Sequence, residues 1–169
     1  GTRTMRPDKF ADYAIALCKL FHDAKLGWEG PGPGTQFCNQ VIHREYGHCV
    51  KRRVTEEHSS KVTKKLGVNV QGEDKLKLFG GGGSGHEGFY GAVVDGKAIP
   101  RSEKLVEECG EYLYKKRNGK LIVVHKSDAV KKAGTDDHGK DHGDRVVAAA
   151  IAWMAAQEVG KLEDDIEPP

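Results

Sequence analysis

The sequence has few cysteines and no paired cysteine motif. Its four cysteines are far apart, at Cys18, Cys38, Cys49 and Cys109, and no Cys-x-x-Cys occurs. Three of them stand in otherwise apolar patterns, where a reduced cysteine acts as a small hydrophobic residue. The cysteines therefore predict a protein of the reducing cytoplasm.

Two further absences narrow the class of protein. No apolar run of membrane-spanning length and no secretion signal occurs, so we expect no membrane partner. Neither sign of charge dominates, because 27 Lys and Arg stand against 25 Asp and Glu, and a net charge of +2 does not indicate a nucleic-acid partner. With 37% hydrophobic and 31% charged residues, the chain is typical of a single globular domain over 1–169 that ends in an acidic tail over 157–169.

Several catalytic motifs are missing as well. The glycine-rich stretch GGGGSGHEG lacks the GK[ST] ending of a phosphate-binding loop, so it is interpreted as a flexible loop. His138 and His142 have the spacing of a zinc pair, but the glycines beside them disfavour a helix, and no Cys and His set completes four ligands. The serine-hydrolase motif GxSxG is absent too.

The chain does contain an alternation of helical and strand patterns. Their boundaries are given by glycine, proline and capping residues. The expected elements, in order, are a helix over 8–25, a strand ending at Glu29, a helix from Thr35 to Gly47, a strand over 48–54, a hairpin-like region within 78–96, a helix from Ser102 to Asn118-Gly119, a strand over 121–125 and a helix from Arg145. This order predicts an α/β fold with a mixed, mostly parallel sheet flanked by helices.

Two carboxylates stand where ligand binding is favoured. Glu29 ends an apolar strand just before the loop GPGPG, and Asp144 opens the alanine-rich closing helix near Asp141 and His142. Ordinary explanations stay open, with Asp144 as a helix N-cap and Glu29 as an acid that leaves the core for water. If the two converge, their oxygens suit Mg²⁺ or Mn²⁺, the ions of two-metal phosphodiester hydrolysis.

Basic residues occur in short runs. One run is Lys51, Arg52 and Arg53, and another is Lys115, Lys116 and Arg117. Each run is either a solvated charged face or a surface that holds phosphates.

Three stretches resemble the C-terminal nuclease domain of the large terminase subunits of tailed phages, which has a ribonuclease H-like fold. They are FADYAIALCKLFHDAKLGWEGPGPG, IPRSEKLVEECGEYLYKKRNGKLIVVH and HGDRVVAAAIAWMA, and they extend from about Phe10 to about Ala156. In that family one catalytic acid precedes a glycine-containing loop, and the last one opens an alanine-rich helix. By this resemblance Glu29 corresponds to the second catalytic acid and Asp144 to the third.

The resemblance implies an endonuclease that uses Mg²⁺ or Mn²⁺ to cut concatemeric viral double-stranded DNA during genome packaging in the host cytoplasm, encoded by a phage or a prophage. Glu29 and Asp144 would be catalytic metal ligands, with Asp141 and His142 as supporting groups. The lysines and arginines of the basic runs would hold the duplex by its phosphates without reading bases. The implied protein partners are the terminase ATPase domain, the portal and the small terminase subunit.

One feature of that family has no counterpart here. Its first catalytic acid lies on a strand upstream of the first helix, and GTRTMRP is too short to supply that strand. Asp8 and Asp12 fall at the start of the helix or within it, so neither is a good replacement. We therefore expect a domain that is incomplete at its N-terminus, binds metal weakly and cuts DNA slowly or not at all. A non-catalytic ribonuclease H-like module that contacts DNA or packaging proteins is the alternative, and a junction resolvase is a third possibility.

Overall fold

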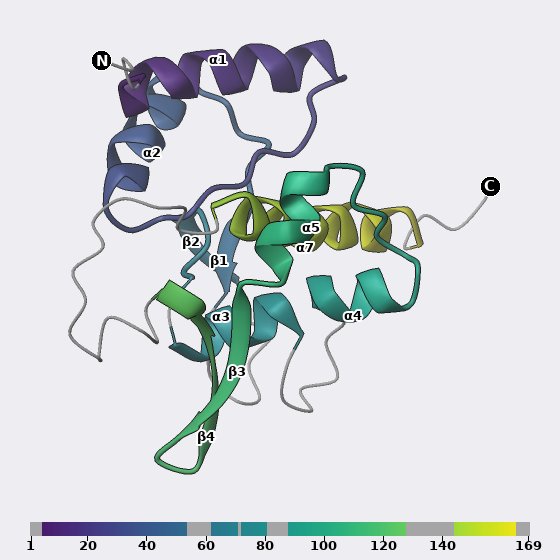
Figure 1. Ribbon diagram of the computed structural model, residues 1–169. Helices are drawn as coiled ribbons and strands as arrows, with labels where there is room; N and C mark the ends of the chain where they lie inside the picture. The colour runs from purple at the N-terminus through teal and green to yellow at the C-terminus, as the bar shows by residue number, and fades with distance from the viewer. Residues whose placement is uncertain (1–4, 54–61, 71, 81–87, 128–143, 165–169) are drawn as a thin grey trace. The chain divides into compact units, whose positions relative to one another are not determined.

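The computed structural model describes residues 5–53, 62–70, 72–80, 88–127 and 144–164 (Figure 1). The chain divides into two compact units. Unit 1 comprises residues 1–69 and 155–169, and unit 2 comprises residues 70–154. The long helix α7 (Asp144–Asp164) begins in unit 2 and ends in unit 1, because the division falls within it.

Unit 1 is built on two helices that pack against each other. Helix α1 (Pro7–Leu20) and helix α2 (Pro33–His43) both begin with proline. Proline lacks a backbone N–H, but in the first turn of a helix the N–H groups make no hydrogen bond within the helix, so no bond is lost. One face of each helix is buried and joins a single hydrophobic cluster. Its members are Ala11, Ile15, Leu26, Trp28, Phe37, Val41, Tyr46 and Cys49.

An extended segment over residues 26–30 follows α1 and pairs in parallel with two later segments. It forms isolated bridges to Cys49 and to Val68. The Val68 N–H donates to the Trp28 carbonyl oxygen at 2.7 Å, and the Gly30 N–H donates to the Val68 carbonyl oxygen at 2.8 Å. These bonds fix the backbone on both sides of the predicted catalytic acid, Glu29.

The described part of unit 2 contains short helices, a β-hairpin and the start of α7. The helices are α3 (Gly72–Phe79), α4 (Phe89–Val94) and α5 (Glu103–Cys109). Aromatic rings hold these elements together, since the ring of Phe79 lies 5.2 Å from that of Tyr90 and 4.8 Å from that of Tyr112, centroid to centroid.

The predicted mixture of helices and strands is confirmed, but the prediction of a mostly parallel sheet is wrong. Strands β1 (Lys51–Arg53) and β2 (Val62–Leu66) pair antiparallel, and so do β3 (Tyr112–Arg117) and β4 (Lys120–His125). Among the described residues, parallel pairing is limited to the two bridges of segment 26–30. The alternation of helical and strand patterns along the chain predicts the order of the elements. Whether two strands pair in parallel or antiparallel depends on which strands lie next to each other in the folded chain.

The prediction of one helix from Ser102 to Asn118-Gly119 is wrong in its second half. The first half is confirmed, because the Leu105 N–H donates to the Ser102 hydroxyl at 3.4 Å and caps α5. The helix ends at Cys109, and the chain then forms strand β3. Asn118 and Gly119 both have positive φ, 51° and 76°, which is the conformation of a two-residue hairpin turn that matches the twist of its strands.

Other boundaries differ by smaller amounts. Helix α1 ends at Leu20 and not at residue 25, and α2 begins at Pro33 with Gly32, not Thr35, as its N-cap. The region within 78–96 is not a hairpin in its described part, since residues 89–94 form α4. None of the helices that the structure describes combines the length and the apolar character needed to span a bilayer.

Candidate functional site

The backbone that carries Glu29 is held by a close contact with a glycine at the start of α2. A Cβ atom on Gly34 would lie 1.7 Å from the Glu29 carbonyl oxygen, so only glycine fits there. The Thr35 hydroxyl donates to the Gly30 carbonyl oxygen at 3.4 Å. The loop GPGPG therefore lets the first turn of α2 lie directly against this segment, while the Glu29 side chain stays exposed to solvent.

A second glycine packs beside the same segment. A Cβ atom on Gly67 would lie 2.9 Å from Nε1 of Trp28, and Gly67 has a φ of 78°, which favours glycine. The Trp28 indole is buried, and its N–H has no hydrogen-bond partner among the described residues. Gly67 and the first turn of α2 thus both pack closely against the backbone of residues 28–29.

Asp144 is the first residue of α7, where a carboxylate is favoured by the helix dipole. Its neighbour Arg145 is held by Glu108 of α5, a carboxylate that is 6% exposed. The Arg145 N–H donates to Oε2 of Glu108 at 3.1 Å, and the Arg145 guanidinium pairs with Oε1. Glu108 therefore fixes the start of α7, and with it the position of the exposed Asp144. No sequence motif marked Glu108.

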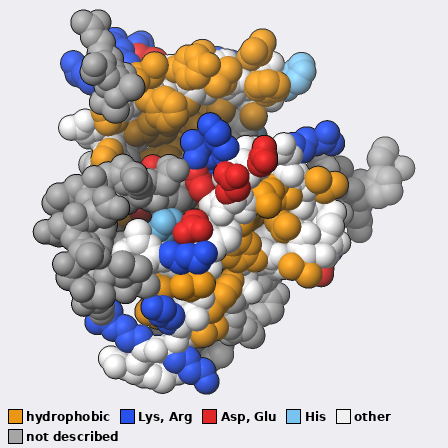
Figure 2. All heavy atoms as spheres, in the orientation of Figure 1, with side chains coloured by type: hydrophobic (Ala, Val, Ile, Leu, Met, Phe, Trp, Pro, Cys, Tyr) orange, Lys and Arg blue, Asp and Glu red, His pale blue; other side chains and the backbone are white. Residues whose placement is uncertain are grey.

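The surface beside Glu108 is a shallow hollow of about 320 Å³. Its lining carries both signs of charge and consists of Lys104, Glu107, Glu108, Glu111 and Arg145. Figure 2 shows acidic and basic side chains intermingled in the middle of this view. Glu111 pairs with Lys126 at 3.2 Å, so part of the acidity is neutralised within unit 2.

The predicted metal ligands fall into different parts of the chain. Glu29 lies in unit 1 and Asp144 lies in unit 2, and each residue is described by its surroundings within its own unit. Asp141 and His142 lie outside the described residues. Among the residues that the structure describes, no group of three or more His, Cys, Asp or Glu side chains is arranged to hold a metal ion. Glu29 and Asp144 are both exposed, and carboxylate oxygens are ligands that suit Mg²⁺ or Mn²⁺.

The predicted DNA-binding residues Lys115, Lys116 and Arg117 lie at the end of the hairpin formed by β3 and β4 (Figure 1). All three are exposed, and the turn that follows brings an exposed fourth cation, Lys120, directly opposite Arg117. Lys120 was not among the residues predicted to bind DNA. The dipeptide Asn118-Gly119 is typical of a two-residue hairpin turn, and such a turn would have predicted that Lys120 lies opposite Arg117.

The other basic run forms a strand. Lys51, Arg52 and Arg53 make up β1. Their predicted contact with DNA stays a prediction.

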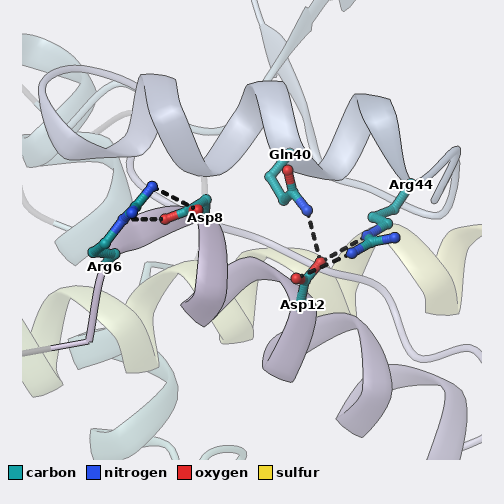
Figure 3. A network of polar contacts seen from close by, with 5 residues as sticks. All are labelled: Arg6, Asp8, Asp12, Gln40 and Arg44. Carbon is teal, nitrogen blue, oxygen red and sulfur yellow. Dashed lines mark hydrogen bonds and ion pairs between the residues drawn. The ribbon is translucent and has the colours of Figure 1, made fainter.

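Asp8 and Asp12, the two acids near the N-terminus, take part in ion pairs, and the contacts of Asp12 join α1 to α2 (Figure 3). Asp12 of α1 accepts hydrogen bonds from Nε2 of Gln40 and from Nε of Arg44, both at 2.8 Å. The Arg44 and Gln40 bonds lower the pKa of Asp12 from 3.8 to about 2. Asp8 pairs with Arg6 at 3.0 Å. Asp12 thus serves to join α1 to α2.

Comparison with known proteins gives no relative: no protein-family model, curated protein or solved structure matches the chain.

Proposed function

We propose that this chain is a metal-dependent nuclease domain of the tailed-phage terminase type, which hydrolyses phosphodiesters in concatemeric viral double-stranded DNA. The observation that carries the proposal is the exposed cationic end of the β3–β4 hairpin. The hairpin residues 112–125 include four Lys and Arg and no Asp or Glu. A cationic surface of this kind binds the phosphate backbone without regard to base sequence.

The proposed metal ligands for hydrolysis are the two exposed acids, Glu29 and Asp144. Glu29 and Asp144 are each fixed at the backbone, the first by Gly34 and the second through Glu108 and Arg145. Rigid backbone placement is what a metal-ligating acid needs, because small displacements cost large factors in rate. A bound Mg²⁺ or Mn²⁺ would supply an activated water and stabilise the leaving oxygen.

The proposal extends to fold and partners. The ribonuclease H-like arrangement brings the second and third acids of the terminase family to one metal, so it requires Glu29 and Asp144 to meet there. The partners are then double-stranded DNA, the terminase ATPase domain, the portal and the small terminase subunit. The proposed fold and the protein partners rest on the resemblance of the three sequence stretches. The β3–β4 hairpin supports only the proposal that DNA is a partner.

The test uses Mn²⁺ as a paramagnetic probe. In a ¹⁵N-labelled sample of the whole chain, bound Mn²⁺ broadens the amide signals of nearby residues. We expect the signals of Trp28 and Gly30 to broaden at the same Mn²⁺ concentration as those of Arg145 and Val146. Glu29→Gln and Asp144→Asn should each abolish the broadening in both segments, and Glu45→Gln, an exposed acid elsewhere in unit 1, should change neither.

Nicking of a supercoiled plasmid with Mn²⁺ is measured on the same variants. Slow nicking that Glu29→Gln removes supports the nuclease. Broadening in one segment without the other contradicts the shared metal site. DNA binding without nicking or joint broadening favours the alternative, a non-catalytic module that contacts DNA.

A further inference from the structure

The register of the β3–β4 hairpin sorts its cations onto two faces. The three pairs nearest the turn are Lys115 with Ile122, Lys116 with Leu121, and Arg117 with Lys120. Side chains on a strand point alternately to opposite faces, and directly paired residues share a face. Lys115, Arg117 and Lys120 therefore lie on one face of the hairpin, which we call the cationic face. Lys116 lies on the other.

The face that carries Lys116 turns toward the aromatic core of unit 2. Tyr112 and Tyr114 share this face, because they are four and two residues before Lys116. The Tyr112 ring lies 4.8 Å from that of Phe79, and the Tyr114 ring lies 6.4 Å from that of Tyr90, centroid to centroid. The cationic face thus turns away from this core, and the core anchors the hairpin at its base.

The cationic face concentrates positive charge on one side of the hairpin. Arg117 and Lys120 are direct cross-strand neighbours on it, and Lys115 adds a third positive charge two residues along the same face. Several cations on one face attract an anionic polymer toward that face.

We propose that the cationic face, Lys115, Arg117 and Lys120, is the surface that contacts the phosphates of double-stranded DNA, and that Lys116 is not part of it. This inference rests on the proposed function and specifies the side chains that bind its substrate. A two-stranded ribbon, with strands about 4.8 Å apart, fits a B-DNA major groove about 12 Å wide.

The test compares two neighbouring variants that remove the same charge. Lys115→Gln acts on the cationic face and Lys116→Gln on the opposite face, so net charge and chain position are matched. Binding of a fluorescent 25-base-pair duplex of arbitrary sequence is measured by anisotropy, without metal, at several salt concentrations. We expect Lys115→Gln, Arg117→Gln and Lys120→Gln each to weaken binding by roughly two- to fivefold and to lower the salt slope by about one. Lys116→Gln should leave the slope close to that of the unmodified chain.

The outcomes separate the inference from the proposed function. Equal losses for Lys115→Gln and Lys116→Gln, with clear DNA binding by the unmodified chain, overturn the face assignment and leave the proposed function standing. No DNA binding by the unmodified chain overturns the proposed function itself. Binding to phosphatidylserine vesicles that depends on the same three residues, without binding to the duplex, overturns DNA as the ligand.

Discussion

Glu108 of α5 accepts hydrogen bonds from both the backbone N–H and the guanidinium of Arg145, at the start of α7. The two residues are 37 positions apart in the sequence, yet the bond ties a short helix to the first turn of the longest one. Because Asp144 precedes Arg145, this contact determines where the proposed metal ligand stands within unit 2.

We expect Glu108→Ala to lower the free energy of unfolding of unit 2 by roughly 1–3 kcal/mol, since the Arg145 N–H loses its partner. Hydrogen exchange followed by mass spectrometry should show faster exchange in the peptide that starts at Asp144. Glu107→Ala is the matched control, because Glu107 is the exposed neighbour in the same helix. Similar exchange in both variants would show that Glu108 does not hold α7.

Gly34→Ala should destabilise unit 1, although alanine normally favours a helix over glycine. The added Cβ would lie 1.7 Å from the Glu29 carbonyl oxygen, so backbone must shift, and we expect a loss of about 1–3 kcal/mol or more. The buried Trp28 reports unfolding of this unit by fluorescence in a Trp153→Phe background. Gly47→Ala, where a Cβ meets nothing within 4 Å, should leave stability nearly unchanged. An equally stable Gly34→Ala variant would contradict the close packing of α2 on segment 26–30.

The ion pair of Asp12 predicts a pH dependence at the acid end. Its pKa is lowered in the folded chain from 3.8 to about 2, so the stabilisation is complete above 3.8 and is lost as the pH falls through about 2. We expect the difference in melting temperature between the unmodified chain and Asp12→Asn to shrink across this window. In an Arg44→Gln background this pH window should narrow, because the hydrogen bond from Arg44 is the largest cause of the lowered pKa of Asp12. A difference that is constant from pH 6 to pH 2 would contradict the pairing.

The cysteines should differ in reactivity. Burial raises the pKa of the Cys49 thiol to about 11, and its Sγ donates to the Tyr46 carbonyl oxygen at 3.1 Å. The thiolate is the reactive form, so Cys49 should be alkylated more slowly than Cys38 in the native chain at pH 8. In urea the two should react alike. Rapid native alkylation of Cys49, read by peptide mass spectrometry, would show that the unit 1 core is open.

The candidate site was predictable only in part. The loop GPGPG placed Glu29 at the end of an extended segment, and an alanine-rich helix placed Asp144 at its start, because both signals are local. Whether the two acids share a metal depends on long-range packing, which no local pattern encodes. Lys120 was not predicted because the helix expected from Ser102 ended at Asn118-Gly119, the dipeptide that forms the hairpin turn.

The sequence by itself determined the elements whose signals lie within a few residues. These are the start of α1, the Ser102 cap of α5 and the beginning of α7. Tertiary structure alone decided the direction of strand pairing, the contact of Glu108 with Arg145 and the packing of Gly34 on Glu29. The physical reason is the range of the interactions: capping and periodicity act between neighbours in the chain, whereas pairing and packing join residues that meet only after folding.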